Sequence, residues 1–423
     1  MSQHQLKRSA NFTRPDGPVV LIIMDGVGLG EEAAHNAVHV AKTPCLDQLM
    51  EGPLYRELKA HGTAVGMPSD ADMGNSEVGH NALGAGRIFD QGAALVNQAI
   101  ESGKLFKTEL WNQLQSKGSE QCLHYIGLLS DGNVHSHIRH LKAMISESVA
   151  AGVKKIRLHT LLDGRDVGGR SALGYVQDLE AFIAQISEGK DVDIRIASGG
   201  GRMLMTMDRY NADWPMVKRG WDAHVLGQAP VVTSATAAIE AAYEDPDLND
   251  QFIPPFVVTE NDTPVGTIED GDAVIFFNFR GDRAIELSMA FEQKDFTHFD
   301  RGRVPDVLFA GALEYDGDLN IPKNYLVDPP QIEGSIGQCF VDTGLSSFAI
   351  SETQKYGHVT FFWNGNQSGY LSEALETYVE IPSDLGDFDK NPAMKAVEIT
   401  DESIQLLKSG RYDFARINYP NGD

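Results

Sequence analysis

One arrangement recurs along this chain and restricts the folds open to it. A short apolar run is followed by a loop rich in Gly, Asp and Arg, and then by a segment with helical spacing of its apolar residues. The apolar runs cover residues 19–24, 124–129, 156–162, 194–197 and 273–277, and helical spacing is clearest over 136–151 and 172–186. Buried strands that alternate with helices are typical of parallel α/β layers. We therefore predict an α/β fold whose ligand site lies at the carboxyl ends of the strands, where the polar loops fall.

The length of the chain predicts more than one domain. A chain of 423 residues exceeds what a single hydrophobic core usually supports. Candidate boundaries fall at 86–91 and at 319–330, the second being rich in Pro, Asn and Asp. Two such boundaries predict one domain inserted into another.

Charge and cysteine usage exclude several classes of partner. A net charge of −25 would repel nucleic acid and anionic membranes. No apolar run is long enough to span a membrane, and residues 1–18 lack the apolar core of a signal peptide. The three cysteines, far apart in sequence, form neither a disulfide framework nor a metal-spacing motif. We therefore expect a cytoplasmic protein with no nucleic-acid or membrane partner.

A single serine stands out in the segment 72–80, which is closed by the glycine-rich 84–87. Ser76 lies among small and polar residues with glycines on both sides, so the backbone there can turn tightly and approach a ligand. Asn75 and Ser76 are residue types that begin helices, where free N–H groups attract anions. Two interpretations stay open: a helix cap followed by a glycine-rich turn, or a serine that attacks a phosphate or sulfate group.

Two further strand ends carry side chains suited to catalysis. Asp25 directly follows the run 19–24, a position typical of a metal ligand, a catalytic carboxylate or a plain turn. His135 and His137 flank Ser136 near the next strand end. We expect His135 to contact a ligand and His137 to cap or support the following helix.

Five arginines give the strongest indication of a ligand. They lie at or just beyond inferred strand ends and are Arg165, Arg202, Arg209, Arg280 and Arg283. In so acidic a protein, arginines converging on one face predict an anionic ligand, since guanidinium binds phosphate and carboxylate in bidentate fashion. The alternative is that each pairs with a neighbouring acid, of which Asp166, Asp208 and Asp282 are adjacent. We expect at least three of the five to contact the ligand.

One lysine could add positive charge to such a site. Lys355 lies in a loop before the strand-like run 358–362. It could neutralise a phosphoryl oxygen or a serine alkoxide, although an isolated lysine in a loop is more often exposed to solvent.

Taken in order, these motifs resemble those of cofactor-independent phosphoglycerate mutases, in the alkaline phosphatase superfamily, over nearly the whole sequence. The motifs are 24–26, 73–80, 129–132, 134–137, 163–166, 201–202 with 207–209, 277–280 and 352–356. The resemblance implies an alkaline-phosphatase-like three-layer domain formed by residues 1–89 and 329–423. An α/β phosphotransferase domain, residues 90–328, would be inserted into it.

The same resemblance implies an activity and a role for each residue. The enzyme would be a monomer that interconverts 3-phosphoglycerate and 2-phosphoglycerate without bisphosphoglycerate, using two divalent metals, manganese or magnesium. Ser76 would become phosphorylated, Asp25 and Ser76 would ligate a metal, and Lys355 would support charge near the serine and contact the substrate. The glycerate would be held by His135, Arg165, Asp166, Arg202 and Arg209, and the phosphate by Arg280 and Arg283.

The chain departs from the family pattern at its last residue. Asp423 matches the first ligand of a metal-binding Asp-Met-Val-Gly-His-Thr-Gly motif, and the ligands that follow in the family are absent. Asp25, Ser76 and Asp423 would make only part of a two-metal site, so we expect a truncated chain with little or no mutase activity. The alternatives are a non-catalytic phosphoglycerate-binding protein, or a metal-dependent phosphatase or phosphopentomutase. The motifs 163–166 and 134–137 argue against the last two.

Overall fold

The computed structural model describes residues 4–13, 16–67, 69–70, 73–90, 92–209, 211–316, 319–328, 332–384 and 388–423. The chain divides into two compact units. Unit 1 comprises residues 1–89 and 331–423, and unit 2 comprises residues 90–330. The second expected domain boundary, at 328/329, adjoins residues 329–331, which lie outside the described part, as does Asp72 of the serine motif.

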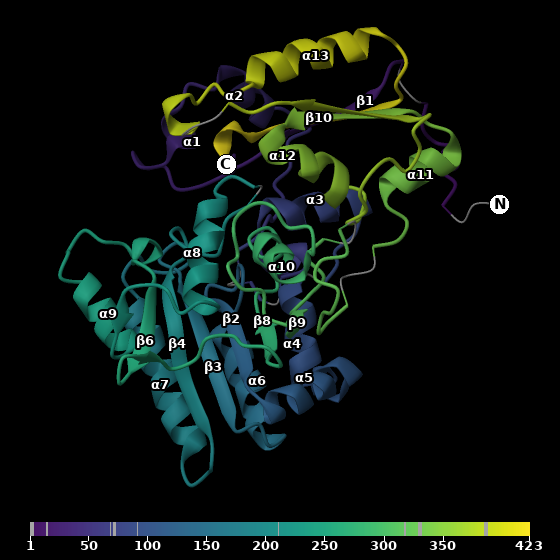
Figure 1. The fold of residues 1–423 in the computed structure, drawn as a ribbon. Helices are drawn as coiled ribbons and strands as arrows, with labels where there is room; N and C mark the ends of the chain where they lie inside the picture. Colours follow the sequence, from purple (N-terminus) through teal and green to yellow (C-terminus); the bar gives the residue numbers. More distant parts are fainter. Residues whose placement is uncertain are drawn as a thin grey trace. The chain divides into compact units, whose positions relative to one another are not determined.

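Unit 2 is built on an eight-stranded mixed sheet with the order β5-β6-β4-β3-β2-β8-β9, and β7 pairs with β6 off this path (Figure 1). Five neighbouring strands are parallel: β4 (Asp193–Gly201), β3 (Lys155–Leu162), β2 (Leu123–Leu129), β8 (Ala273–Phe276) and β9 (Leu308–Gly311). The others are β5 (Val231–Val232), β6 (Phe256–Glu260) and β7 (Thr263–Pro264), and β6 is antiparallel to β4. The predicted runs 124–129, 156–162, 194–197 and 273–277 are therefore confirmed as strands.

Helices cover both faces of this sheet because successive strand residues point to opposite sides. Tyr125 packs into one apolar cluster and Ile126 into another. The first cluster takes in α5 (Glu109–Glu120), α6 (Ile138–Ala150), α7 (Ala172–Ser187) and α9 (Ala235–Ala242). The second takes in α4 (Gly92–Glu101), α8 (Trp214–His224) and α10 (Ile285–Glu292). Helical spacing predicted α6 and α7 correctly.

Unit 1 contains a four-stranded parallel sheet. Its order is β1 (Val19–Met24), β12 (Phe414–Tyr419), β10 (Ser347–Glu352) and β11 (Glu376–Ile381). One apolar cluster joins it to α13 (Ala396–Lys408), and another joins β12 to α11 (Ile336–Thr343). The remaining helices are α1 (Ala37–Val40), α2 (Pro44–Met50), α3 (Ser76–Ala85) and α12 (Thr353–Gly357). None of the helices that the structure describes is long and apolar enough to cross a membrane.

Three local expectations from the sequence were wrong. The run 19–24 forms β1, but no residue of it is buried, because β1 lies at the edge of the described sheet. Strand β4 continues through Gly201, where a loop was expected, since Gly199 allows a close approach to the Thr160 carbonyl of β3. The run 358–362 is a π-helix rather than a strand, and its Val359 carbonyl accepts a hydrogen bond from the buried Arg416.

A chain of buried hydrogen bonds crosses the unit 2 sheet on the side covered by α8. Its members, in order, are Asp272, His124, His159, Ser198, His224 and Thr206, with successive polar atoms 2.7–3.0 Å apart. Burial lowers the pKa of all three histidines, and that of His224 to about 3. Each neutral imidazole has one donor and one acceptor, so every proton in the chain can point toward the Asp272 carboxylate.

These histidines make unit 2 sensitive to acid. Between pH 6.5 and about 3, an unfolded histidine binds a proton that folded His224 excludes, so stability falls as the pH falls. We expect a loss of up to about 1.4 kcal/mol per pH unit for each such histidine. Replacing His224→Gln should reduce this slope in urea unfolding between pH 7.0 and 5.5, whereas replacing the exposed His35→Gln should leave it unchanged. Equal slopes in H224Q and the unsubstituted chain would contradict the prediction.

Candidate active site

The residues predicted to do chemistry lie in two clusters, one in each unit. The first, the serine cluster, forms at the carboxyl ends of the parallel strands of unit 1. Asp25 follows β1, and its N–H donates to the Tyr419 carbonyl of β12. Ser76 is the first residue of α3, whose N-cap Asn75 accepts from the Val78 N–H at 3.0 Å. Asn75 therefore caps α3, and this cap places the serine hydroxyl at a helix N-terminus; the attack of Ser76 on a phosphate or sulfate group remains a prediction.

Asp25 is the centre of the serine cluster. Its Oδ2 accepts from the Ser76 hydroxyl at 2.5 Å and from the Asn418 amide at 3.0 Å, and Lys355 Nζ lies 3.4 Å away. Burial raises the pKa of Asp25, but the charge of Lys355 and the two hydrogen bonds outweigh it and leave that pKa below its usual value. Lys355 also lies 2.7 Å from Asp423, so it is a buried contact of two carboxylates and not a solvent-exposed lysine.

The proton positions around Ser76 follow from its neighbours. His80 Nδ1 lies 2.7 Å from the Ser76 carbonyl oxygen and must donate to it. His80 Nε2 then accepts from the Asn418 amide at 3.1 Å, and burial lowers the pKa of His80. Neutral His80 therefore has no free acceptor for the serine proton, and Asp25 is a weak base. The side chains of this cluster hold the serine hydroxyl in place, but none of them is an effective base for its proton.

The oxygen donors of this cluster suit a divalent metal of the manganese or magnesium type. The carboxylates of Asp25 and Asp423 and the Ser76 hydroxyl are hard ligands, and the buried Oδ1 of Asn418 has no hydrogen-bond partner among the described residues. A Cβ on Gly26 would lie 2.2 Å from Gly422, so this glycine permits the close approach of the Asp25 and Asp423 segments. The three predicted ligands are too few for two closed metal sites.

A different group of side chains has metal-ligand composition but is part of the core. Among the described residues, Cys122, His124 and Asp272 place three such atoms within 4.8 Å of one another. His124 and Asp272 are already hydrogen bonded at 3.0 Å, and burial raises the pKa of the Cys122 thiol to about 12. A neutral thiol is a poor metal ligand, and His124 and Asp272 belong to the buried hydrogen-bond chain, so we assign this group to the core.

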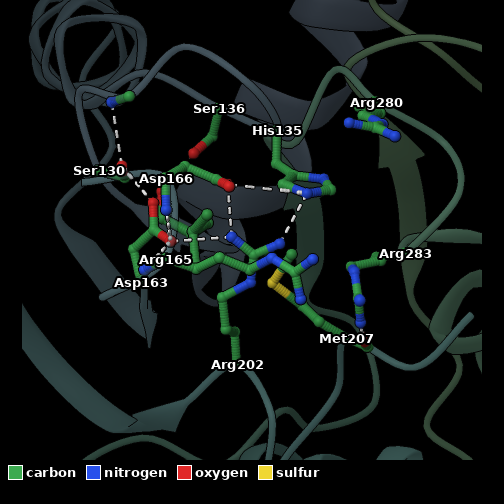
Figure 2. Close-up of polar contacts among 12 residues, drawn as sticks. Ser130, His135, Ser136, Asp163, Arg165, Asp166, Arg202, Met207, Arg280 and Arg283 are labelled. Carbon is green, nitrogen blue, oxygen red and sulfur yellow. Dashed lines mark hydrogen bonds and ion pairs between the residues drawn. The ribbon is translucent and has the colours of Figure 1, made fainter. Parts of the chain in front are cut away.

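The second group, the arginine cluster, lies in unit 2 and is centred on the buried Arg202 (Figure 2). Nη1 of Arg202 donates to Asp163 at 2.8 Å and to Asp166 at 2.5 Å, while Nη2 donates to His135 Nε2 at 2.7 Å. The Asp163 carboxylate also accepts from the Ser130 hydroxyl at 2.6 Å. The loop that follows β3 is therefore tied to the loop that follows β2.

The contact with Arg202 determines the tautomer of His135. A guanidinium is only a donor, so His135 Nε2 carries no proton and the neutral ring is protonated at Nδ1. That nitrogen faces the Asp282 carboxylate at 3.6 Å. Burial lowers the pKa of His135 well below its usual value, and the surrounding arginines lower it further. His135 is thus a neutral donor in a field of positive charge.

Asp282 contacts two of the remaining arginines of the cluster. Its carboxylate lies 3.1 Å from Arg280 and 3.8 Å from Arg209. Arg283 donates to the Met207 carbonyl at 2.6 Å, and burial together with the neighbouring Arg209 lowers its pKa to about 10. Arg165 is exposed to solvent, and its charge also acts on Arg283.

The predicted arginines cluster together, but some of them also pair with neighbouring acids. All five arginines gather in one unit, as predicted, but Arg202, Arg209 and Arg280 also pair with Asp163, Asp166 or Asp282. With the buried Asp208 next to Arg209 included, five guanidinium groups face four carboxylates, so the cluster keeps an excess of positive charge. His137 caps α6 by accepting from the Arg139 N–H, as expected.

Sequence reasoning missed several residues that organise these clusters. Asn418 lies in the run that becomes β12, which is apolar apart from Arg416 and Asn418, and its polar character in that run was the available signal. His80 closes the serine motif but received no role. Asp163 is the first residue of the motif 163–166, but we assigned substrate-binding roles only to Arg165 and Asp166. The roles themselves remain predictions.

Comparison with known proteins identifies the family. Residues 96–317 match the family model described as the N-terminus of BPG-independent phosphoglycerate mutase. The chain is 52% identical over 423 residues to the 2,3-bisphosphoglycerate-independent phosphoglycerate mutase of Trypanosoma brucei brucei, covering 99% of this chain and 77% of that protein. The chain belongs to the 2,3-bisphosphoglycerate-independent phosphoglycerate mutase family.

Further relatives agree with this assignment. The mutase of Zea mays is 50% identical and covers 98% of this chain, which spans 76% of the maize protein. A crystal structure of Leishmania mexicana phosphoglycerate mutase at low cobalt concentration superposes with a TM-score of 0.92 at 51% identity. That match covers 99% of this chain and 77% of the Leishmania chain. The resemblance predicted from the motifs is confirmed.

The buried position of Arg202 makes it essential for the stability of unit 2. Replacing Arg202→Met would leave Asp163 and Asp166 without their cation, which typically costs about 3–5 kcal/mol for a buried pair. Replacing the exposed Arg165→Met, in the same loop region, should change stability by less than about 0.5 kcal/mol. Urea unfolding followed by fluorescence measures both. A small effect of R202M would show that water replaces its contacts.

Proposed function

We propose that this protein interconverts 3-phosphoglycerate and 2-phosphoglycerate through a phosphoserine at Ser76, without bisphosphoglycerate. The observation that carries the proposal is the Ser76 hydroxyl, which lies at a helix N-terminus 2.5 Å from Asp25, with Lys355 at 3.4 Å from the same carboxylate. A phosphoryl group there would meet helix N–H groups and an ammonium. In this proposal unit 1 contains the alkaline-phosphatase-like three-layer domain (1–89 and 329–423), and residues 90–328 form the inserted phosphotransferase domain.

The reaction needs two balanced transfers. In the first, the bond between phosphorus and O3 of the glycerate breaks, a bond from phosphorus to Ser76 Oγ forms, and the serine proton ends on O3. In the second, a bond from phosphorus to O2 of the same glycerate forms, the bond between phosphorus and Ser76 Oγ breaks, and the O2 proton ends on Ser76 Oγ. The transfers are in line and carry little covalent chemistry for the protein, so positioning and charge stabilisation provide most of the catalysis.

A divalent metal, manganese or magnesium, held by Asp25, Ser76 and Asp423 with further ligands, would lower the pKa of the serine hydroxyl and neutralise phosphoryl charge. Lys355 contributes a fixed positive charge between Asp25 and Asp423. Because its neighbours keep Asp25 ionised, it acts as a metal ligand and a hydrogen-bond acceptor and does not take up the serine proton.

The arginine cluster supplies the binding site for the glycerate and its phosphate. His135, Arg165, Asp166, Arg202 and Arg209 would hold the glycerate, and Arg280 and Arg283 the phosphate end. Burial lowers the pKa of Arg283 and the neighbouring Arg209 lowers it further; an anionic ligand would offset both effects by favouring the charged guanidinium. We also expect a cytoplasmic monomer without nucleic-acid or membrane partners.

The serine is tested by substitution in the native enzyme. Ser76→Ala should lower turnover of 3-phosphoglycerate by about 10⁴-fold or more, because the nucleophile is lost. It should also abolish the phosphorylated protein seen by intact mass after rapid quenching, while 3-phosphoglycerate still binds. The exposed Ser102→Ala serves as control. Retained turnover in S76A would contradict the proposal, and release of inorganic phosphate without 2-phosphoglycerate would favour a phosphatase.

The arginine cluster is tested by binding alone. Arg209→Gln and Arg280→Gln should each weaken 3-phosphoglycerate binding by roughly 10- to 100-fold in calorimetry, as expected when a charge-assisted hydrogen bond is removed. The exposed Arg139→Gln, on α6, should change affinity less than about twofold. Unchanged affinity in both cluster variants would place the phosphoglycerate elsewhere.

A further inference from the structure

Glu286 is a buried acid beside the arginine cluster to which the proposed reaction gives no role. It is the second residue of α10, three residues after Arg283, and only 3% of its surface is exposed. Its Oε1 accepts from the Asn211 N–H at 2.8 Å. Its carboxyl also forms a side-chain hydrogen bond with Asp208, a contact that requires a proton on one of the two acids. Carboxyl groups are rarely buried without a structural or functional reason, so this one needs an explanation.

The segment that Glu286 contacts carries Arg209 and binds Arg283. We call residues 206–209 and 211–213 the Arg209 loop. Arg209 reaches toward Asp282, and the Met207 carbonyl accepts from Arg283 at 2.6 Å. The position of two proposed ligand arginines therefore depends on this loop.

The Arg209 loop is anchored firmly at its beginning. Thr206 has a left-handed backbone with φ of +66°, and its hydroxyl lies 3.0 Å from His224 Nε2. A Cβ on Gly220 of α8 would lie 2.1 Å from the Thr206 hydroxyl oxygen, so the helix fits closely against it. Further along, the Asp208 carboxylate accepts from the Asp213 N–H at 2.6 Å. Glu286 is the contact that joins this loop to α10.

The charge of Glu286 decides whether its carboxyl attracts or repels the Asp208 carboxylate of this loop. Burial raises the pKa of Glu286 to about 8, and the facing Asp208 carboxylate adds to the rise. The Asn211 N–H and Arg283 oppose it without cancelling it. Glu286 is therefore protonated and neutral at pH 7. Above pH 8 it becomes a second negative charge next to Asp208, and two adjacent buried carboxylates repel each other.

We propose that Glu286 is a positioning residue for phosphoglycerate binding: its neutral carboxyl holds the Arg209 loop against α10, and its ionisation loosens that loop and its two arginines. The proposal rests on the function proposed above for the arginine cluster. The sign follows from the Glu286–Asp208 hydrogen bond, which needs a proton on one of the two acids and is lost as the pH rises, whereas the Asn211 N–H can donate to either form of Glu286. The substrate phosphate is already a dianion in this range, so its own titration gives no alkaline loss of affinity.

The first experiment is calorimetry of 3-phosphoglycerate binding to the 423-residue chain between pH 7 and 9. Affinity of the unsubstituted chain should fall above pH 8, by up to about tenfold per pH unit for one linked proton. Glu286→Gln keeps a neutral group of the same shape and should flatten this profile. The matched control is Glu292→Gln, on the same helix outside the cluster, which should keep the alkaline loss.

Asp208→Asn provides a second variant. It keeps the acceptor for the Asp213 N–H but removes the charge that opposes Glu286, so it should also flatten the profile. An alkaline loss that persists in both E286Q and D208N, or a flat profile of the unsubstituted chain, would overturn the proposal.

Hydrogen exchange of the ligand-free chain separates this proposal from the proposed function. Protection of the amides of residues 207–209, corrected for intrinsic rates, should fall above pH 8 in the unsubstituted chain and stay constant in E286Q. If no variant binds 3-phosphoglycerate at pH 7, the proposed function fails, and the exchange result alone decides the role of Glu286. Protection that is independent of pH would overturn that role.

Discussion

The parallel direction of the strands is the constraint on which the rest of this protein depends. In unit 1, β1, β12 and β10 run the same way, so the residues that follow β1 and β10 and those at the end of β12 meet at one edge of the sheet. This edge collects Asp25, Lys355 and Asp423 from three distant parts of the chain. In unit 2 the same rule places the loops after β2, β3 and β4 together. Both clusters are consequences of backbone hydrogen bonding as much as of side-chain chemistry.

Each cluster places charges in a buried setting and balances them differently. Around Asp25 the protein supplies one ammonium and two neutral donors, which keep a carboxylate ionised despite burial. Around Arg202 and Asp282 it supplies more guanidinium groups than carboxylates; burial lowers the pKa of both Arg283 and His135, and the neighbouring arginines lower it further. The first cluster therefore attracts a cation and the second an anion. This division suits a reaction in which a phosphoryl group moves while its carrier stays bound.

Neutral buried polar groups hold the charged residues of each cluster in position. The histidines of the unit 2 hydrogen-bond chain, His80 in unit 1 and Glu286 on α10 are each polar, and burial holds them without net charge at neutral pH. A neutral imidazole or carboxyl can orient a neighbour through a directional hydrogen bond without adding to the local field. The charged residues of the site are thus positioned by partners that do not compete for the ligand.

The sequence by itself determined the α/β class, the strand runs, the helices α6 and α7, and the family, because apolar periodicity and motif order are local properties. It also predicted that the five arginines would share a site, since strand ends in a parallel sheet share an edge. Only the tertiary structure decided that Arg202 donates its hydrogen bonds to Asp163, Asp166 and His135. It also decided that Lys355 bridges two carboxylates and that residues 358–362 form a π-helix. These outcomes depend on which distant groups are buried together, and burial changes both the charge of a side chain and the partners available to it.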